Sequence, residues 1–185
     1  TIFNRHTPDT TKKSGAKTWN DEGNRDGYRP ESLTVELYAD GVATGKTVTT
    51  NETEGWAWSF DNLAKNAVKD GKGGQAIVYT VDEETFANDG EYTKTKNGMN
   101  LANTHEKETV DISVKKAWDD ANNQDGKRPE SVQIKLTADG RDVGGTVTLS
   151  GENGWKHEWT GLDKKAGGNE INYAVEEIVV PTGYT

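Results

Sequence analysis

The 185-residue sequence contains no cysteine, which excludes disulfide bonds and thiolate metal sites. Small extracellular β domains often need a covalent cross-link, which is usually a disulfide bond. A domain of this chain cannot form one. The three histidines, His6, His105 and His157, show no paired ligand spacing. We therefore favour a structural role for them and predict no metal site.

Long apolar runs are also missing, since no stretch approaches the ~20 residues that a membrane helix needs. No secretory or lipidation signal is visible, so we expect the sorting signals of an exported protein to lie outside these residues. An excess of 31 acidic over 22 basic residues gives a net charge of −9, which opposes binding to nucleic acid or anionic lipid. There is no glycine-rich phosphate loop and no nucleophile motif, so we predict neither a cofactor nor turnover of an external substrate.

Hydrophobic residues are scarce, at 31% of the chain, yet six Trp, six Tyr and regularly spaced Val, Ile and Leu are present. This composition favours sparse, aromatic cores over disorder. The length allows one large domain or two small ones, and small domains lie close to the lower limit for burying enough surface.

An internal repeat decides between these possibilities. The stretch KTWNDEGNRDGYRPESLTVELYADG (17–41) aligns without a gap with KAWDDANNQDGKRPESVQIKLTADG (116–140), at an offset of 99. GWAWSFDNL (55–63) matches GWKHEWTGL (154–162) at the same offset, and GGQAIVYTVDE (73–83) matches GGNEINYAVEE (167–177) after a five-residue deletion. The chain therefore contains two copies of one unit.

The first residues repeat the end of the first copy: at the offset of 99, Ile2, Asn4 and His6 fall on Leu101, Asn103 and His105. The second copy stops before such a segment. We therefore expect residues 1–8 to be the last strand of a preceding repeat, residues 9–107 to form a complete repeat, and residues 108–185 to form a repeat without its last strand.

Within each copy the apolar residues alternate with polar ones, which is typical of half-buried strands. The alternating residues are Leu33, Val35 and Leu37; Trp56, Trp58 and Phe60; Ile77, Tyr79 and Val81; and Val132, Ile134 and Leu136. Turn-forming stretches such as RDGYRP and ADG separate these strands. The pattern predicts antiparallel β-sandwiches, with at most one helical turn at 61–72.

Alternation also predicts that some charged residues point inward, because residues two apart share a strand face. Lys116 shares a face with three apolar residues, and Lys17 is its equivalent. Glu83 and Glu177 are each the last residue on the apolar face of another predicted strand. Asn103 shares a face with Leu101. Burying unpaired charges is costly, so these side chains either satisfy one another or lie at strand ends and reach water.

The repeated motifs resemble the B-type repeats of the collagen-adhesin (Cna) family, found in surface adhesins and pilins of Gram-positive bacteria. The matching motifs are KTW and KAW, DGYRPESL and DGKRPESV, ADG, the GW strand, YTVDE and YAVEE, and NTHE. This resemblance implies a transthyretin-like, reversed-immunoglobulin sandwich. It also implies a spontaneous isopeptide bond between the lysine of the first strand and the asparagine of the last, promoted by the glutamate.

For the first copy, the resemblance implies that Lys17 attacks Asn103 and that Glu83 assists. An apolar site favours a neutral, nucleophilic amine and a protonated carboxyl group, which would hydrogen-bond the amide oxygen and pass a proton to the departing ammonia. Folding itself would bring the groups together, so each domain reacts once and the protein is not a turnover enzyme.

In the second copy, Lys116 and Glu177 have no asparagine partner within the same repeat. Asn4 is the surplus acceptor, but the thirteen residues from Asn4 to Lys17 reach at most ~45 Å. We therefore predict that strand 1–7 of one molecule can add to the second domain of another, with a Lys116–Asn4 bond and head-to-tail chains.

Two other patterns favour structural interpretations. Glu22, Asn24, Asp26 and Gly27 have the spacing of a calcium loop, but position twelve is Leu33, so a polar turn is favoured. The tryptophans of the GW strands, namely Trp56, Trp58, Trp155 and Trp159, are expected in the core rather than in a carbohydrate or peptide site.

We therefore expect stalk repeats of an extracellular, bacterial cell-surface adhesin or pilus-like protein, anchored to the cell wall through other regions, with neighbouring repeats as partners. The alternative is an adhesin module that itself recognises a host matrix protein or glycan.

Overall fold

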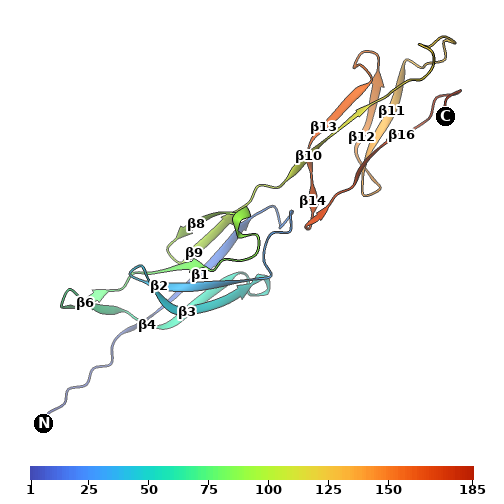
Figure 1. Ribbon diagram of the computed structural model, residues 1–185. Helices are drawn as coiled ribbons and strands as arrows, with labels where there is room; N and C mark the ends of the chain where they lie inside the picture. Colours follow the sequence, from blue (N-terminus) through green and yellow to red (C-terminus); the bar gives the residue numbers. More distant parts are fainter. The chain divides into compact units, whose positions relative to one another are not determined.

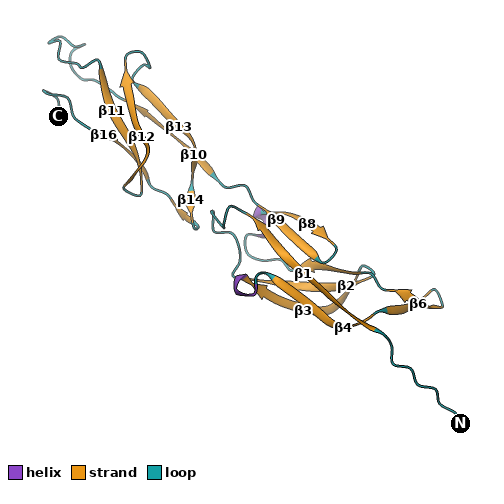
Figure 2. Ribbon diagram, turned by 180° about the vertical axis from the view of Figure 1, so that it is seen from behind, coloured by secondary structure: helices purple, strands orange, loops and turns teal.

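A computed structural model describes all residues, 1–185, and its regular secondary structure consists almost entirely of strands (Figure 2). The chain divides into two compact units. Unit 1 comprises residues 1–24 and 28–106, and unit 2 comprises residues 25–27 and 107–185. The only helices are two three-residue 3₁₀ turns, η1 (Glu52–Glu54) and η2 (Asp89–Glu91), and no helix is long and apolar enough to cross a membrane. The predicted all-β fold class is confirmed.

Unit 1 contains nine strands that follow one another closely along the chain. They are β1 (Thr10–Asn20), β2 (Ser32–Ala39), β3 (Val42–Asn51), β4 (Ala57–Ala64), β5 (Asn66–Lys69), β6 (Lys72–Ala76), β7 (Tyr79–Glu83), β8 (Thr93–Asn97) and β9 (Asn100–Thr104).

The strands of unit 1 form two main sheets, in the orders β4-β1-β9-β8 and β3-β2-β7 (Figure 1). β1 pairs antiparallel with β4 and parallel with β9, with Lys17 opposite Leu101 and Trp19 opposite Asn103. The first and last strands of the unit are therefore neighbours in one sheet. Gly15 permits this close approach, because a Cβ at this position would lie 1.7 Å from the Met99 carbonyl oxygen.

The core of unit 1 lies between the two sheets and follows the predicted alternation. Its nine buried members are Leu33, Val35, Leu37, Trp56, Trp58, Phe60, Leu63, Val81 and Leu101. Trp19 packs against them and makes an edge-to-face contact with Trp56, their ring centroids being 5.3 Å apart. Tight aromatic contacts of this kind compensate for a low apolar content.

Residues 61–72 differ from the expectation of a helical turn. They comprise the end of β4, all of β5 and the turn into β6. Asp70 and Gly71 both have positive φ, of 51° and 73°, which suits a two-residue hairpin turn and excludes a right-handed helix at this point. The segment therefore forms a β-hairpin and contains no helical turn.

Unit 2 repeats the first seven strands of unit 1 in the same order. They are β10 (Thr109–Lys115), β11 (Ser131–Ala138), β12 (Arg141–Ser150), β13 (Lys156–Asp163), β14 (Lys165–Ala166), β15 (Asn169–Glu170) and β16 (Tyr173–Glu177). The sheets are β10-β13, β12-β11-β16 and the small pair β14-β15. β10 thus corresponds to β1, and β16 corresponds to β7.

The core of unit 2 is smaller than the core of unit 1. Val132, Ile134 and Leu149 form its buried cluster, and Trp118, Trp155 and Trp159 pack against them while remaining partly exposed. The predicted inward face of β10 is present, because Ile112 and Val114 alternate with exposed residues, but both are only half-buried.

Candidate functional site

Three strands bring Lys17, Glu83 and Asn103 together in the interior of unit 1. Lys17 lies on β1 and Asn103 on the adjacent β9. Glu83 lies at the end of β7, in the opposite sheet, where it pairs with Val35 of β2. Period-two alternation turns all three side chains toward the space between the sheets.

The carboxylate of Glu83 bridges the other two side chains. One oxygen, Oε2, accepts a hydrogen bond from Nζ of Lys17. The other oxygen, Oε1, accepts a hydrogen bond of 2.9 Å from Nδ2 of Asn103. The same carboxylate therefore contacts both the lysine nitrogen and the amide nitrogen of the asparagine.

This cluster is closed to water. The side chains of Lys17 and Glu83 are 0% and 2% exposed, and Asn103 is 1% exposed. Nζ of Lys17 also lies 4.7 Å from the ring centroid of Trp19. The amide oxygen of Asn103 is buried and has no hydrogen-bond partner. Such a site holds reactive groups in fixed positions in a low-dielectric environment.

Burial lowers the pKa of Lys17 below its ordinary value, although its hydrogen bond and ion pair with Glu83 oppose that shift. The reason is desolvation, which disfavours the ammonium form. The direction agrees with the expectation that the site favours the neutral amine.

The pKa of Glu83 moves in the direction opposite to the expectation of a protonated carboxyl group. Burial raises it, but hydrogen bonds from Lys17 and Asn103 outweigh burial, and the pKa lies below its ordinary value. As long as Lys17 carries its proton, Glu83 is a carboxylate. A neutral Glu83 therefore requires that it first receive a proton from Lys17.

Lys94 is a member of this cluster that the sequence reasoning missed. It lies on β8 directly opposite Asn103, and its Nζ is 3.1 Å from Oε1 of Glu83. It also forms an ion pair with Asp89. Burial lowers the pKa of Lys94, but the bonds to Asp89 and Glu83 outweigh burial and raise it, so Lys94 remains an ammonium beside the carboxylate.

In unit 2 the equivalent lysine and glutamate also meet, but in a more open site. Nζ of Lys116 lies 2.8 Å from Oε2 of Glu177, and the two side chains are 23% and 19% exposed. Nζ of Lys116 lies 4.7 Å from the Trp118 ring centroid, the same distance as in unit 1. The second oxygen of Glu177, Oε1, is buried and has no hydrogen-bond partner.

Asn4, the other predicted acceptor, lies ahead of the first strand of unit 1. Residues 1–9 belong to no strand and run as an extended segment ahead of β1 (Figure 1). Ile2 and Phe3 in this segment are 93% and 88% exposed.

A second cluster, which sequence reasoning also missed, fixes the long loop that follows β1. Asp21 accepts hydrogen bonds from the Arg29 guanidinium at 2.5 and 3.1 Å and from the Tyr92 hydroxyl at 3.2 Å. The Asn24 side chain accepts a hydrogen bond from the backbone N–H of Arg29. Burial raises the pKa of Asp21, but Arg29 outweighs burial and holds it below its ordinary value.

Unit 2 repeats that loop cluster with Asp120, Arg128 and Tyr184. The repetition of an acid, an arginine and a tyrosine in both copies is the signal that sequence reasoning could have used. These internal hydrogen bonds agree with a polar turn.

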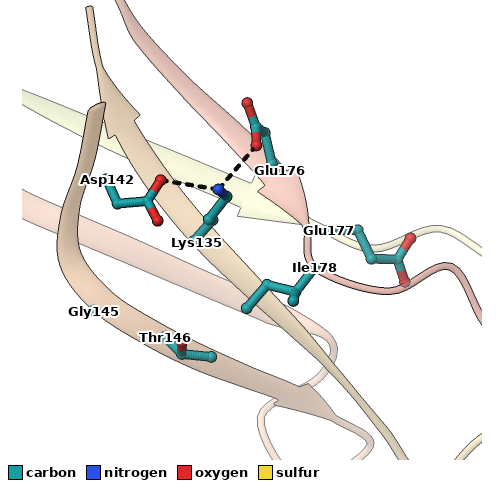
Figure 3. Close-up of a pocket in the computed structure, with 7 residues that line it drawn as sticks. All are labelled: Lys135, Asp142, Gly145, Thr146, Glu176, Glu177 and Ile178. Atoms are coloured by element: carbon teal, nitrogen blue, oxygen red, sulfur yellow. Dashed lines mark hydrogen bonds and ion pairs between the residues drawn. The ribbon is translucent and has the colours of Figure 1, made fainter. Parts of the chain in front are cut away.

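A surface hollow on unit 2 offers an alternative site (Figure 3). Figure 3 shows Lys135 between Asp142 and Glu176, at 2.9 and 3.4 Å, while Glu177 points away from it. The positive charge of Lys135 is therefore already balanced by two carboxylates. Trp56 and Trp58 are 7% and 4% exposed, so they are core residues as predicted and offer no platform for a sugar.

The fold and the site together define tandem β-sandwich repeats, the first of which buries a lysine of its first strand, an asparagine of its last strand and a glutamate of the opposite sheet. Comparison with known proteins places the chain in a family: it belongs to the Cna protein B-type domain family, whose model matches residues 13–104 and 112–185. The predicted family is thereby confirmed.

The chain is similar to one curated protein and to two solved structures described here. The chain is 41% identical over 184 residues to a collagen adhesin of Staphylococcus aureus, covering 100% of this chain and 15% of that protein. It is 40% identical to a solved single B repeat unit (B1) of the S. aureus collagen-binding surface protein Cna, covering 96% of this chain and 90% of that chain, with a TM-score of 0.46. A solved pair of B repeat units (B1B2) of Cna is also 40% identical, covering 98% of this chain and 46% of that chain, with a TM-score of 0.47.

Proposed function

We propose that this protein supplies structural stalk repeats of a bacterial cell-surface adhesin or pilus-like protein, and that unit 1 is locked by an isopeptide bond between Lys17 and Asn103. The observation that supports the bond is the Glu83 carboxylate, which contacts both the nucleophilic nitrogen and the leaving nitrogen. Membership of the Cna B-type family supports the stalk role and the cell-surface location.

The reaction begins within the ion pair. Lys17 transfers one proton to Oε2 of Glu83, which leaves a neutral amine and a neutral acid, and the lowered pKa of Lys17 favours this step. The amine then attacks Cγ of Asn103, so that the Nζ–Cγ bond forms and the Cγ–Nδ2 bond breaks. Because β1 and β9 are paired neighbours, the reacting groups are held together and proximity supplies much of the acceleration.

Glu83 carries the proton that the leaving group needs. It takes a proton from the attacking nitrogen and gives a proton to Nδ2, which departs as ammonia. The new amide retains one hydrogen on its nitrogen, and one proton remains on Glu83. The buried ammonium and carboxylate are thus replaced by an amide and an uncharged acid, which removes the cost of burying both charges.

The bond would close a loop of about 87 residues, and a cross-link of that span stabilises a domain by roughly 4–5 kcal/mol in the chain-entropy model. It would serve a protein that has no cysteine and only 31% hydrophobic residues. An amide also resists the reducing conditions that open a disulfide. We further propose that residues 9–107 and 108–185 are successive repeats and that residues 1–8 are the last strand of a preceding one.

The proposal is tested by measuring the intact mass of the 185-residue protein under denaturing conditions. We expect a mass one ammonia below that of the unmodified chain, and a cross-linked peptide containing Lys17 and Asn103 after digestion. Lys17→Met, Asn103→Ala and Glu83→Gln should each restore the full mass, whereas Lys116→Met is the matched control and should leave the mass loss unchanged. A wild-type protein that retains its full mass would refute the bond.

The alternative function is recognition of a host matrix protein or glycan by these repeats themselves. A binding assay against immobilised matrix proteins and glycans separates the two: high resistance to proteases and heat without binding supports the stalk, and saturable binding supports the alternative. The charge-balanced hollow of Figure 3 gives no reason to prefer the alternative.

A further inference from the structure

We infer that Asp89 determines which lysine of unit 1 becomes joined to Asn103. It holds Lys94 as an ammonium ion, so that Lys17 alone reacts. The inference rests on the bond proposed above and concerns the choice of nucleophile within that site. Three observations support it: a second lysine beside the same asparagine, an acid paired with this second lysine, and an aromatic cluster that fixes the acid in place.

Asn103 has a lysine on each of its two neighbouring strands. β9, which carries Asn103, lies between β1 and β8 in its sheet. Lys94 lies on β8 directly opposite Asn103, and the Cβ atoms of such a pair are about 5 Å apart. Lys17 lies on β1, two residues before the partner of Asn103. Position in the sheet therefore gives Lys94 as good an approach to the amide as Lys17 has.

Both lysines also contact the carboxylate that assists the reaction. Nζ of Lys94 lies 3.1 Å from Oε1 of Glu83, and Nδ2 of Asn103 lies 2.9 Å from the same oxygen. Two groups that contact one oxygen are neighbours, so Nζ of Lys94 lies near the amide. Lys17 contacts the other oxygen, Oε2. Proximity and the carboxylate are thus available to both amines, and a further feature has to select between them.

The two lysines differ in their ion pairs and in their exposure. Lys17 forms an ion pair with Glu83, and its side chain is 0% exposed. Lys94 forms ion pairs with both Glu83 and Asp89, and its side chain is 33% exposed. Burial lowers the pKa of Lys17, whereas Asp89 and Glu83 together outweigh burial and raise the pKa of Lys94. Only an unprotonated amine is a nucleophile, so Lys94 is the unreactive member of the pair.

An aromatic cluster fixes the position of Asp89. This residue begins the turn η2, which lies between Phe86 and Tyr92. The rings of Phe86 and Tyr92 both contact Trp19, with centroids 5.8 and 5.2 Å from the Trp19 centroid. Nζ of Lys94 lies 5.5 Å from the Phe86 ring centroid. The turn is therefore attached to the core on both sides, and it holds the Asp89 carboxylate beside Lys94.

The choice of lysine decides whether the bond stabilises the unit. A Lys17–Asn103 bond joins the first strand to the last, across about 87 residues. A Lys94–Asn103 bond would join two strands of one hairpin across about ten residues, and the chain-entropy model gives the shorter loop less stabilisation. It would also consume the same amide. Asp89 thus preserves Asn103 for the bond that closes the unit.

Without Asp89, the same chemistry is open to Lys94. One proton passes from Nζ to Glu83, Nζ bonds to Cγ of Asn103, and the Cγ–Nδ2 bond breaks. Nδ2 departs as ammonia with a proton delivered through Glu83, and one proton remains on Glu83. The product has the same mass as the Lys17 product. The two are distinguished by which peptides are joined after digestion.

Variants that lack Lys17 test the inference. Lys17→Met alone should retain its full mass under denaturing conditions, because Asp89 keeps Lys94 protonated. Lys17→Met with Asp89→Asn should lose one ammonia, and digestion should give a peptide in which Lys94 is joined to Asn103. Adding Lys94→Arg should abolish this loss, since arginine keeps the positive charge but stays protonated.

Asp82→Asn is the matched control. Lys96 lies two residues beyond Lys94 on β8 and lines the same surface hollow, and its Nζ is 2.6 Å from Oδ2 of Asp82. Removing that acid releases another lysine of the strand but leaves the ion pair of Lys94 with Asp89 intact. Lys17→Met with Asp82→Asn should therefore retain its full mass.

The chain that retains Lys17 provides a second measurement. The wild-type protein should give the Lys17–Asn103 peptide alone. Asp89→Asn should give a mixture in which the Lys94–Asn103 peptide appears beside it, and Asp89→Ser should do the same. The two substitutions remove the negative charge with side chains of different size, so a shared result follows from the charge.

Full mass in Lys17→Met with Asp89→Asn or Asp89→Ser, in protein whose urea transition shows a folded unit 1, would overturn the inference. A Lys94–Asn103 bond in the wild type or in Lys17→Met alone would also overturn it, because Asp89 would then not protect the acceptor. A wild-type Lys17–Asn103 bond together with either result refutes this inference alone. A wild-type protein that retains its full mass refutes the proposed function.

Discussion

The two units share one sequence pattern, yet they bury their equivalent lysines to different degrees. The side chain of Lys17 is 0% exposed, and that of Lys116 is 23% exposed. The difference follows from β8 and β9, which cover the lysine in unit 1 and have no counterpart among residues 108–185. The strand that carries Asn103 therefore also removes water from Lys17.

This comparison shows how the proposed reaction can be restricted to the folded domain. Burial lowers the pKa of Lys17, and that burial is complete only when β9 is in place. β9 therefore supplies both the Asn103 side chain that is attacked and the burial that favours the neutral amine of Lys17.

The largest expected difference between the units concerns the cross-link. Lys17→Met should lower the free energy of unfolding of unit 1 by about 4–5 kcal/mol, because the unfolded chain regains the entropy of an open loop. Urea unfolding followed by tryptophan fluorescence measures this change. Lys116→Met is the matched control and should leave the unit 1 transition in place; an unchanged midpoint in Lys17→Met would contradict the prediction.

The loop clusters provide the next difference. In unit 1 the side chains of Arg29 and Asp21 are 16% and 2% exposed, whereas those of Arg128 and Asp120 are 25% and 11% exposed. Arg29→Met leaves a buried carboxylate without its partner and should cost about 3–5 kcal/mol. Arg128→Met should cost less, because water reaches Asp120. Urea midpoints of the two variants test this order, and equal losses would show that burial does not set the cost.

Acid should weaken unit 1 through Glu83 when the cross-link is prevented. In an Asn103→Ala variant, Lys17 and Lys94 still contact Glu83. The pKa of Glu83 lies below its ordinary 4.5 through hydrogen bonds from Lys17, Asn103 and Lys94, and this variant loses only the one from Asn103. We therefore expect a smaller stabilisation that is complete above pH 4.5 and is lost as the pH falls through the folded-state pKa. The urea midpoint of this variant should fall as the pH decreases from 7 to 3. Adding Glu83→Gln should remove the part of that fall that comes from Glu83. An identical slope in both variants would contradict the assignment.

The smallest expected difference concerns one backbone position. Asn62 in unit 1 and Gly161 in unit 2 are equivalent and both have positive φ, of 55° and 67°. Gly161→Ala should destabilise unit 2 by about 1 kcal/mol, because a Cβ disfavours the left-handed region. Asn62→Gly should change unit 1 little, since both residues tolerate this conformation. Urea unfolding of the two variants measures both effects.

Much of the fold could be predicted because alternation and the internal repeat report on the same strands. The inward positions of Lys17, Glu83 and Asn103 followed from residues two apart sharing a face. Lys94 could not be found in this way, because its contact with Glu83 depends on how β8 pairs with β9. The contact of Tyr92 with Asp21 spans 71 residues, and only its repetition in both copies indicates it.

The direction of the Glu83 pKa could not be predicted for a related reason. Alternation indicates that a carboxyl group is buried, and burial alone raises its pKa. The opposing effect comes from two hydrogen bonds whose geometry only the folded structure contains. The β5-β6 hairpin at 66–76 was not predicted because its strands, Asn66–Lys69 and Lys72–Ala76, carry no regular alternation of apolar and polar residues.

The parallel pairing of β1 and β9 has a mechanical consequence. A pull on the two ends of unit 1 enters at the start of β1 and leaves at the end of β9, so it acts along both strands and shears their shared hydrogen bonds. With the proposed bond in place, the load would pass from Lys17 directly to Asn103. Residues 18–102 would then carry none of it, and the repeat would keep its length under a force that unravels an unlinked domain.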